Sequence, residues 1–248
     1  MEFGSMSTKG NIIIACAGQK GGNGKSFCAR MMASEMACQK RTVAMVDLDI
    51  GQHTAADWNA AREANKVQPS IKVDIVDPDE EPDFRLKELA ADFNLVVLDA
   101  PGFSDQITMA MALVADLVVL PTGPTVDDLR PTMRLFYELE QGGIDKRRMA
   151  VVLNRIGTEA EEKAARAYLK GGNIEALPTA LYDLPVYRQA LNVGKGPSEF
   201  GKEETRKAAQ TLVGEVMKRA RDAHKAPTAG DKSSPRPRRF VVKEGETW

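Results

Sequence analysis

Cysteine, histidine and aromatic residues are scarce in this chain, and each scarcity narrows the kinds of site it can hold. The 248 residues include three cysteines, two histidines and 6% aromatic residues. Cys16, Cys28 and Cys38 do not have the spacing of a metal site or of a disulfide framework, so we expect them to pack in the interior of a protein kept in a reducing compartment. His53 and His224 have no obvious metal-binding partners, and we expect both to face solvent.

Long apolar runs and a net charge are absent as well. No stretch approaches the ~20 apolar residues that a membrane-spanning helix needs, and the N-terminus lacks the pattern of a secretory signal. The 34 basic and 35 acidic residues leave a formal net charge of −1, so the overall charge does not indicate nucleic-acid binding. At 43% hydrophobic residues, the chain can bury a substantial core.

Composition divides the chain into three parts. We expect residues 1–9 to be a vector-derived leader, ahead of Met6, followed by a short disordered start. Residues 10–224 are expected to form one folded domain. Residues 225–248 are basic and rich in proline, which predicts a disordered tail.

Within the folded part, short apolar runs alternate with helix-forming segments. The predicted strands cover residues 11–17, 42–46, 71–76, 94–99, 116–120, 149–153 and 176–181. The predicted helices cover residues 26–39, 55–64, 84–93, 106–114, 127–142, 159–170 and 203–224. This alternation predicts an α/β fold, a mostly parallel twisted sheet with helices on both faces. Ligands of such sheets bind at the carboxyl ends of the strands.

A glycine-rich segment follows the first predicted strand and opens the first predicted helix. Residues 20–26 read Lys-Gly-Gly-Asn-Gly-Lys-Ser. The three glycines let backbone N–H groups converge on phosphate oxygens, and the helix that follows directs its positive end at the same anion. The segment therefore predicts a phosphate-binding loop of a nucleoside-triphosphatase, with Lys25 at the β- and γ-phosphates and Ser26 at Mg²⁺.

Aspartates end two further predicted strands. Asp99 follows four apolar residues, the position at which such proteins hold the Mg²⁺ shell. Asp47 and Asp49 end the second predicted strand. Strand-end aspartates also cap helices, but beside a phosphate loop we predict that Asp99 holds the metal and that Asp49, also near the metal, orients the attacking water.

The phosphate loop resembles the deviant phosphate loop of the MinD/ParA superfamily of ATPases, because a second lysine lies five residues before the conventional one. Other segments resemble further blocks of the ParA branch, nearest to its small partition ATPases. These segments are residues 46–49 with Trp58, residues 98–102, residues 120–125 with Asp128 and Leu129, and residues 152–155 and 185–190. Together they span about residues 10–220.

The resemblance implies a role for each matching residue. Lys20 would cross the interface of an ATP-sandwiched homodimer and touch the partner's phosphates. Phe27 stands where the family usually has threonine, which leaves only its backbone N–H for the α-phosphate. The implied catalytic residues are Lys20, Lys25 and Asp49. The implied metal residues are Ser26, Asp49 and Asp99. The implied nucleotide contacts are Gly21, Gly22, Asn23, Gly24, Lys25, Ser26, Phe27 and, at the adenine, Asn154.

Basic residues gather in the last predicted helix and beyond it. They predict non-specific DNA contact, although a solvated helix face would have the same composition. The chain ends in a proline-rich segment without the amphipathic helix of MinD-type proteins, so we expect no membrane contact. The predicted DNA contacts are Lys202, Arg206, Lys207, Lys218, Arg219 and Arg221.

The predicted function is that of a weak, Mg²⁺-dependent ATPase in the cytoplasm, associated with the nucleoid, that partitions DNA with a centromere-binding adaptor. One alternative keeps the ATPase but positions a protein cargo, such as a chemoreceptor cluster or a microcompartment. Another is a phosphate-loop enzyme acting on a small molecule. An electron-donating iron protein is excluded, because no cysteine follows Cys38. The region before the first strand is too short for an operator-binding helix-turn-helix.

Overall fold

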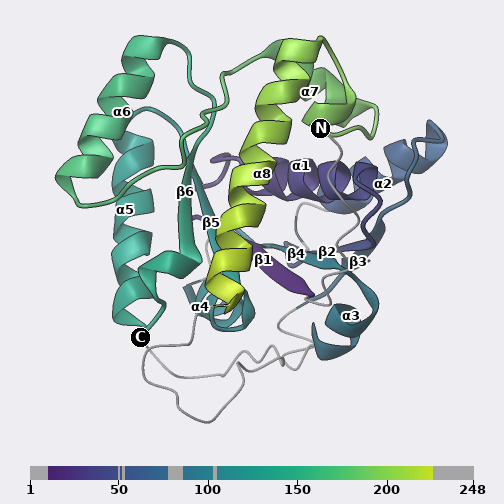
Figure 1. Cartoon of the computed structure of the whole chain (residues 1–248), viewed down its shortest axis with the longest axis horizontal. Coiled ribbons are helices and arrows are strands. Elements are labelled where there is room, and N and C mark those ends of the chain that lie inside the picture. Colours follow the sequence, from purple (N-terminus) through teal and green to yellow (C-terminus); the bar gives the residue numbers. More distant parts are fainter. Residues whose placement is uncertain (1–10, 50, 52–53, 78–85, 103–104, 226–248) are drawn as a thin grey trace.

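The computed structural model describes residues 11–49, 51, 54–77, 86–102 and 105–225. Its centre is a parallel six-stranded sheet in the order β3-β2-β4-β1-β5-β6 (Figure 1). The strands are β1 (Ile12–Cys16), β2 (Val43–Asp47), β3 (Lys72–Ile75), β4 (Leu95–Asp99), β5 (Leu117–Thr122) and β6 (Met149–Leu153). The predicted α/β fold with a parallel sheet is confirmed.

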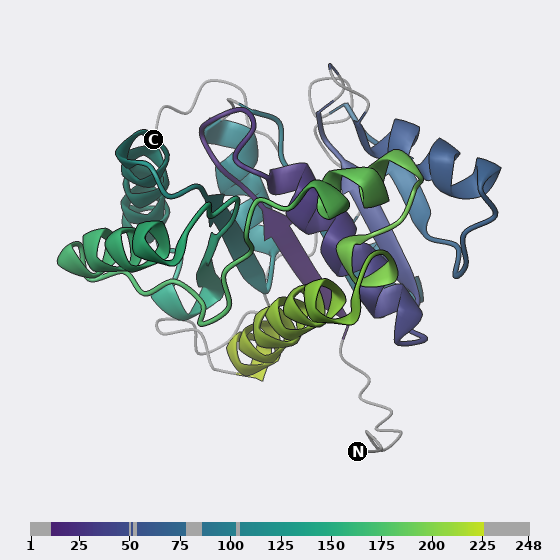
Figure 2. The same cartoon turned by 90° about the horizontal axis from the view of Figure 1, so that it is seen from above.

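Helices cover both faces of the sheet (Figure 2). On one face lie α1 (Lys25–Cys38), α2 (Thr54–Ala64), α7 (Pro185–Asn192) and α8 (Glu203–Lys225). On the other lie α3 (Leu86–Asp92), α4 (Asp105–Val114), α5 (Val126–Gln141) and α6 (Glu159–Gly171). Two short 3₁₀ turns, η1 (Lys146–Arg148) and η2 (Pro197–Glu199), precede β6 and α8.

The central strands are apolar throughout because both of their faces are covered. In β1, Ile13 and Ala15 pack against the α3–α6 layer, while Ile12 and Ile14 pack against the α1–α8 layer. The edge strand β3 is different: none of its residues is buried, and Ile75 is 42% exposed. The predicted edge-like character of that segment is confirmed.

Strand register brings the functional loops to one edge of the sheet. Asp99, the last residue of β4, pairs with Cys16 at the end of β1 and with Asp47 at the end of β2. The strand order reverses direction at β1, which lies between β4 and β5. Such a reversal opens a crevice at the carboxyl ends of the strands, and this is where α/β proteins bind ligands.

Two local predictions were wrong or incomplete. The segment 176–181 is not a strand but runs beside β6 with an isolated bridge from Ala176 to Val151. Pro178 has no N–H to donate and interrupts any ladder there. Helix α7 was not predicted, although its first residue, Pro185, is typical of a helix N-terminus.

Two of the scarce residue types also differ from expectation. Cys16 and Cys28 are buried as predicted, whereas Cys38 is exposed. His224 does not simply face solvent, because its Nδ1 lies 2.9 Å from Oδ1 of the buried Asp116. His53, residues 1–10 and residues 226–248 lie outside the described residues, so the predicted domain boundaries stay predictions.

Candidate nucleotide-binding site

The phosphate loop connects β1 to α1 with the backbone that its glycines allow. Gly22 and Gly24 have positive φ angles of 77° and 99°, which residues with a Cβ rarely adopt. A Cβ at Gly24 would also lie 2.2 Å from Nδ2 of Asn154, so glycine is required there for space as well. Gly21 and Gly22 are exposed at the mouth of the loop.

Lys25 begins α1 and turns back under the loop. Its side chain is buried, and its Nζ donates a 3.3 Å hydrogen bond to the carbonyl oxygen of Lys20. Burial lowers the pKa of Lys25, and the carboxylates of Asp99 and Asp49 oppose that change. Three residues predicted from separate segments therefore meet at one point.

Asp99 is fully buried, and neither of its carboxylate oxygens has a hydrogen-bond partner. Burial, followed by repulsion from Asp47, raises the pKa of Asp99 to about 7. The Ser26 hydroxyl opposes this rise but does not reach full hydrogen-bond geometry. A buried carboxylate without partners is costly, and a cation held between Ser26 and Asp99 would satisfy it. The site therefore fits Mg²⁺.

Asp47 has a structural task that the sequence left open. Its Oδ1 accepts a hydrogen bond of 2.9 Å from the backbone N–H of Asp49, and its Oδ2 accepts one of 3.1 Å from the N–H of Ala55 in the first turn of α2. Both acceptors are therefore occupied. Asp47 fixes the loop that carries Asp49, whose own side chain is half-buried beside the phosphate loop.

Asn154 follows β6 and closes the loop from the side. It is 4% exposed, and its Nδ2 lies 3.5 Å from the carbonyl oxygen of Asn23, a marginal hydrogen bond. The side-chain amide of Asn23 is buried with both polar atoms unpartnered. Unpaired buried amide groups beside converging glycines fit a site that is completed by a polar ligand such as a nucleotide.

Lys20 forms an ion pair within the chain. Its Nζ lies 2.7 Å from Oδ1 of Asp128 at the start of α5, and the two side chains are 45% and 7% exposed. Burial would raise the pKa of Asp128, but hydrogen bonds from Lys20 and Thr125 outweigh burial and lower it. Gln19 makes a second tie to α5, donating a 2.6 Å hydrogen bond to Glu138. Sequence reasoning assigned Asp128 no role.

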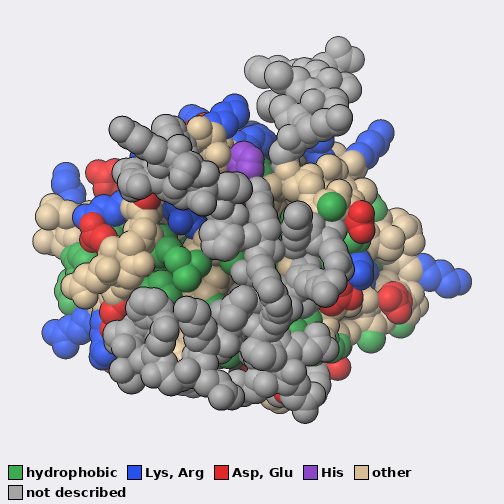
Figure 3. Space-filling view, turned by 90° about the horizontal axis from the view of Figure 1, so that it is seen from below, with side chains coloured by type: hydrophobic (Ala, Val, Ile, Leu, Met, Phe, Trp, Pro, Cys, Tyr) green, Lys and Arg blue, Asp and Glu red, His purple; other side chains and the backbone are tan. Residues whose placement is uncertain are grey.

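The predicted DNA contacts lie in α8, apart from Lys202, which directly precedes it. Arg219 is half-buried, donates a hydrogen bond to the carbonyl oxygen of Lys146, and has its pKa lowered by burial, so it is not a free surface cation. On the face seen from below, the Lys and Arg side chains that are visible lie around the rim (Figure 3). The other five predicted contacts are exposed: Lys202, Arg206, Lys207, Lys218 and Arg221.

The described residues contain neither a cluster of metal-binding side chains nor a membrane-spanning helix. No group of three or more His, Cys, Asp or Glu side chains is placed to hold a metal ion among the residues that the structure describes. Mg²⁺ beside a nucleotide is held largely by phosphates and water with one or two protein oxygens, so this finding does not test the predicted metal residues. No described helix is long and apolar enough to cross a membrane.

Comparison with solved structures finds the same fold in nucleotide-bound proteins. MinD from Pyrococcus horikoshii OT3 in complex with Mg-ADP superposes with a TM-score of 0.64 at 19% identity over 87% of this chain and 100% of that one. The ATP complex of a McdA variant from Cyanothece gives 0.65 at 16% identity over 84% and 96%. A protein named as a plasmid partition protein from Borrelia burgdorferi B31, bound to AMPPNP, gives 0.64 at 13% identity over 84% and 99%.

Comparison with protein families gives the assignment. Curated protein sequences gave no match. The family model described as the CobQ/CobB/MinD/ParA nucleotide binding domain matches residues 14–188, which include the phosphate loop, both aspartate segments and Asn154. The chain therefore belongs to the MinD/ParA superfamily of phosphate-loop ATPases.

Proposed function

We propose that this protein is a dimer-switch ATPase that binds DNA without sequence preference when loaded with ATP, and that it partitions DNA with an adaptor that stimulates hydrolysis. The observation that carries the proposal is the position of Lys20. Its ammonium group lies at the mouth of the phosphate loop, 45% exposed and paired with Asp128. A lysine so placed can leave its own chain's carboxylate for the phosphates of a second subunit.

The remaining site residues supply the parts of a phosphoryl-transfer site. Bound Mg²⁺ and ATP would supply the transferable phosphoryl group and the charge that offsets its oxygens. The loop N–H groups and Lys25 would hold the phosphates, Ser26 and Asp99 would hold the metal shell, and Asn154 would contact the base. Asp49, fixed by the hydrogen bond from its N–H to Asp47, orients the water.

The pairing of Lys20 with Asp128 explains why such an ATPase would be slow as a monomer. A lysine can stabilise developing phosphate charge only when its ammonium group faces the phosphates. In the described chain that group is engaged by Asp128, whose side chain is 7% exposed. Dimer formation would provide the competing anion, so catalysis would depend on assembly.

Helix α8 supplies the proposed DNA surface. Its exposed basic residues contact phosphate by charge alone, which gives affinity without sequence specificity and a strong dependence on salt. Lys207, Lys218 and Arg221 follow one another at helical spacing on the solvent side. ATP-dependent attachment to such a surface implies a protein associated with the nucleoid.

The deciding experiment measures the ATPase rate and the affinity for random duplex DNA at a stated salt concentration, with ATP or ADP and Mg²⁺. The proposal expects DNA binding in ATP that falls steeply with salt, together with DNA-stimulated turnover. Turnover that ignores DNA and requires a small-molecule co-substrate would support the phosphate-loop enzyme instead. Adding the product of a neighbouring DNA-binding gene then tests the adaptor.

A further inference from the structure

Phe27 connects the phosphate loop to helix α7. It lies in the first turn of α1, directly after Ser26, and its side chain is half-buried. Its ring centroid lies 6.0 Å from that of Tyr187, with the planes 57° apart. Such a tilted aromatic pair is a specific contact. The N–H groups of the first turn of α1 are the ones that face bound phosphate, so the Phe27 ring is attached to backbone that a bound nucleotide would contact.

Tyr187 continues the connection to α8, the helix of the proposed DNA surface. It is 4% exposed, and its hydroxyl donates a 2.9 Å hydrogen bond to the carbonyl oxygen of Thr205 in the first turn of α8. Three exposed residues lie close to Thr205 in the sequence, namely Lys202, Arg206 and Lys207. One buried side chain therefore contacts both the phosphate-loop helix and the first turn of α8, which contains Arg206 and is flanked by Lys202 and Lys207.

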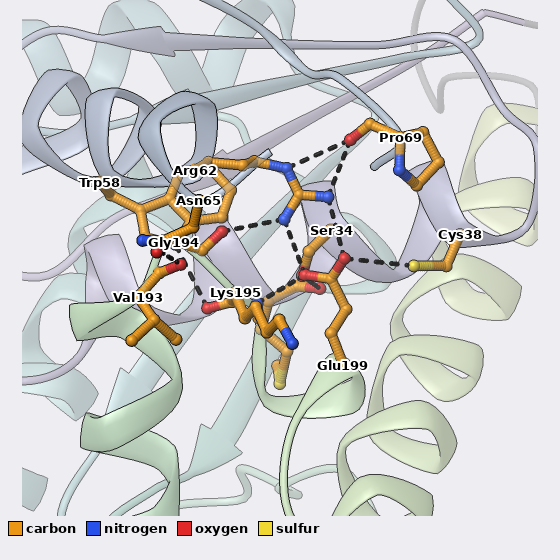
Figure 4. A network of polar contacts seen from close by, with 12 residues as sticks. Ser34, Cys38, Trp58, Arg62, Asn65, Pro69, Val193, Gly194, Lys195 and Glu199 are labelled. Atoms are coloured by element: carbon orange, nitrogen blue, oxygen red, sulfur yellow. Dashed lines mark hydrogen bonds and ion pairs between the residues drawn. The ribbon is translucent and has the colours of Figure 1, made fainter. Parts of the chain in front are cut away.

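The segment after α7 is fixed to α2, as Figure 4 shows. The guanidinium of Arg62, which is 1% exposed, donates to both carboxylate oxygens of Glu199, at 2.8 and 2.9 Å, and to the carbonyl oxygens of Gly194 and Pro69. Trp58 adds a hydrogen bond from its indole N–H to the carbonyl oxygen of Lys195.

These contacts with α2 restrain the segment between α7 and α8. A Cβ at Gly194 would lie 2.1 Å from the backbone nitrogen of Arg62, so the two backbones are in direct contact. Residues 194–199 therefore cannot shift freely to absorb a movement at the other end of α7. A displacement of Tyr187 would instead act on Thr205 through the hydrogen bond between them.

We propose that Tyr187 is a positioning residue that links the nucleotide held by the phosphate loop to the arrangement of the first turn of α8, and thereby to DNA affinity. The DNA part of this inference rests on the proposed function. In thermodynamic terms, Tyr187 carries part of a coupling free energy between two sites, so its removal lowers the ratio of DNA affinities in ATP and ADP and not the affinity for nucleotide itself.

The test is Tyr187→Phe, which keeps the ring contact with Phe27 and removes only the hydrogen bond to Thr205. The matched control is Tyr182→Phe, which removes a hydroxyl that donates a 3.0 Å hydrogen bond to Glu162 on α6. We expect Tyr187→Phe to lower the ATP-to-ADP ratio of DNA affinity by about fivefold, the value of one hydrogen bond. Nucleotide affinity stays unchanged, and the control keeps the wild-type ratio.

A second measurement separates this inference from the proposed function. Hydrogen exchange of residues 202–207 needs no DNA: in the wild type, ATP should increase protection there relative to ADP, and in Tyr187→Phe it should not. Phe27→Leu, which breaks the contact from the other side, should give the same loss if Tyr187→Phe folds poorly. If the wild type does not bind DNA, only the proposed DNA function is wrong. If both variants keep the wild-type difference in hydrogen exchange of residues 202–207 between ATP and ADP, the proposed coupling through Tyr187 is wrong.

Discussion

Asp99 is fully buried, which disfavours its charged form, although its predicted role at the metal requires a carboxylate. Burial raises its pKa from 3.8 to about 7. Between these values the native, nucleotide-free protein binds a proton that the unfolded chain does not, so this group makes stability fall as the pH rises from about 4 to about 7. Each pKa unit corresponds to about 1.4 kcal/mol. A neutral side chain of the same shape would remove this loss of stability at higher pH.

We therefore predict that Asp99→Asn raises the melting temperature of the nucleotide-free protein relative to wild type at about pH 8, and much less at about pH 5. Mg²⁺ and ATP should reverse the order, because the amide is a poor metal ligand. Asp92→Asn, at an exposed acid in the last turn of α3, serves as the control. Equal shifts at the two pH values would contradict the assignment of a raised pKa.

The ion pair between Lys20 and Asp128 competes with any contact that Lys20 makes across a dimer interface. Asp128→Asn weakens that competitor while keeping an acceptor for the Thr125 hydroxyl. We expect ATP-dependent dimers to form at severalfold lower protein concentration, consistent with about 1 kcal/mol for a partly exposed pair. Sedimentation measures it. Asp127→Asn, one residue earlier and exposed, should leave dimerisation unchanged.

Residues near each other in sequence could be predicted, and residues joined only by the fold could not. The loop glycines, Lys25 and Ser26 form one motif with one physical purpose, and Asp99 follows a recognisable strand. Asp128, in contrast, lies 108 residues from Lys20, and the sequence contains no sign of that pairing.

At the scale of elements, α8 determines which of the predicted DNA-contact residues are exposed. Lys218 and Arg221 are exposed, whereas Arg219 turns toward η1. We predict that Lys218→Glu with Arg221→Glu weakens binding to random duplex DNA at least tenfold and flattens its salt dependence by about 1.8 in log–log slope, the effect of two lost phosphate contacts. Lys163→Glu with Lys170→Glu makes the same charge change on exposed positions of α6. Equal loss in both variants would leave α8 without a special role.

Helices and strands could be predicted where the pattern of apolar residues in the sequence agrees with the environment in the fold. The buried strands are short apolar runs between helices, and all six strands of the sheet were placed within two residues of their ends. The segment 176–181 failed because its apolar residues pack beside β6 without forming a ladder. Helix α7 has only eight residues, too short to be stable by itself, so the packing of its buried Tyr187 and Ala190 against the rest of the fold decides its conformation.

At the scale of the whole molecule, the proposed switch depends on Lys20 acting on the partner's nucleotide and Asp49 acting on its own. Subunits carrying Lys20→Ala and subunits carrying Asp49→Ala should each be inactive alone. In a mixed dimer, the Lys20→Ala subunit keeps its own Asp49 and receives Lys20 from its partner, so one of the two sites is complete. With random pairing, an equimolar mixture should recover about a quarter of wild-type turnover, since a two-fold interface makes both sites equivalent.

A chain carrying both substitutions gives the opposite pattern and removes ambiguity. Consider the mixed dimer of one such subunit and one wild-type subunit. The wild-type subunit keeps Asp49 but receives no Lys20, and the double-variant subunit receives Lys20 but has no Asp49. This mixed dimer should therefore be inactive. If Lys20 acted within its own chain, that mixed dimer would keep one working site and the single-variant mixture would stay inactive. Turnover of the two mixtures, at protein concentrations where ATP-dependent dimers are complete by sedimentation, therefore distinguishes a dimer switch from a pair of independent ATPases.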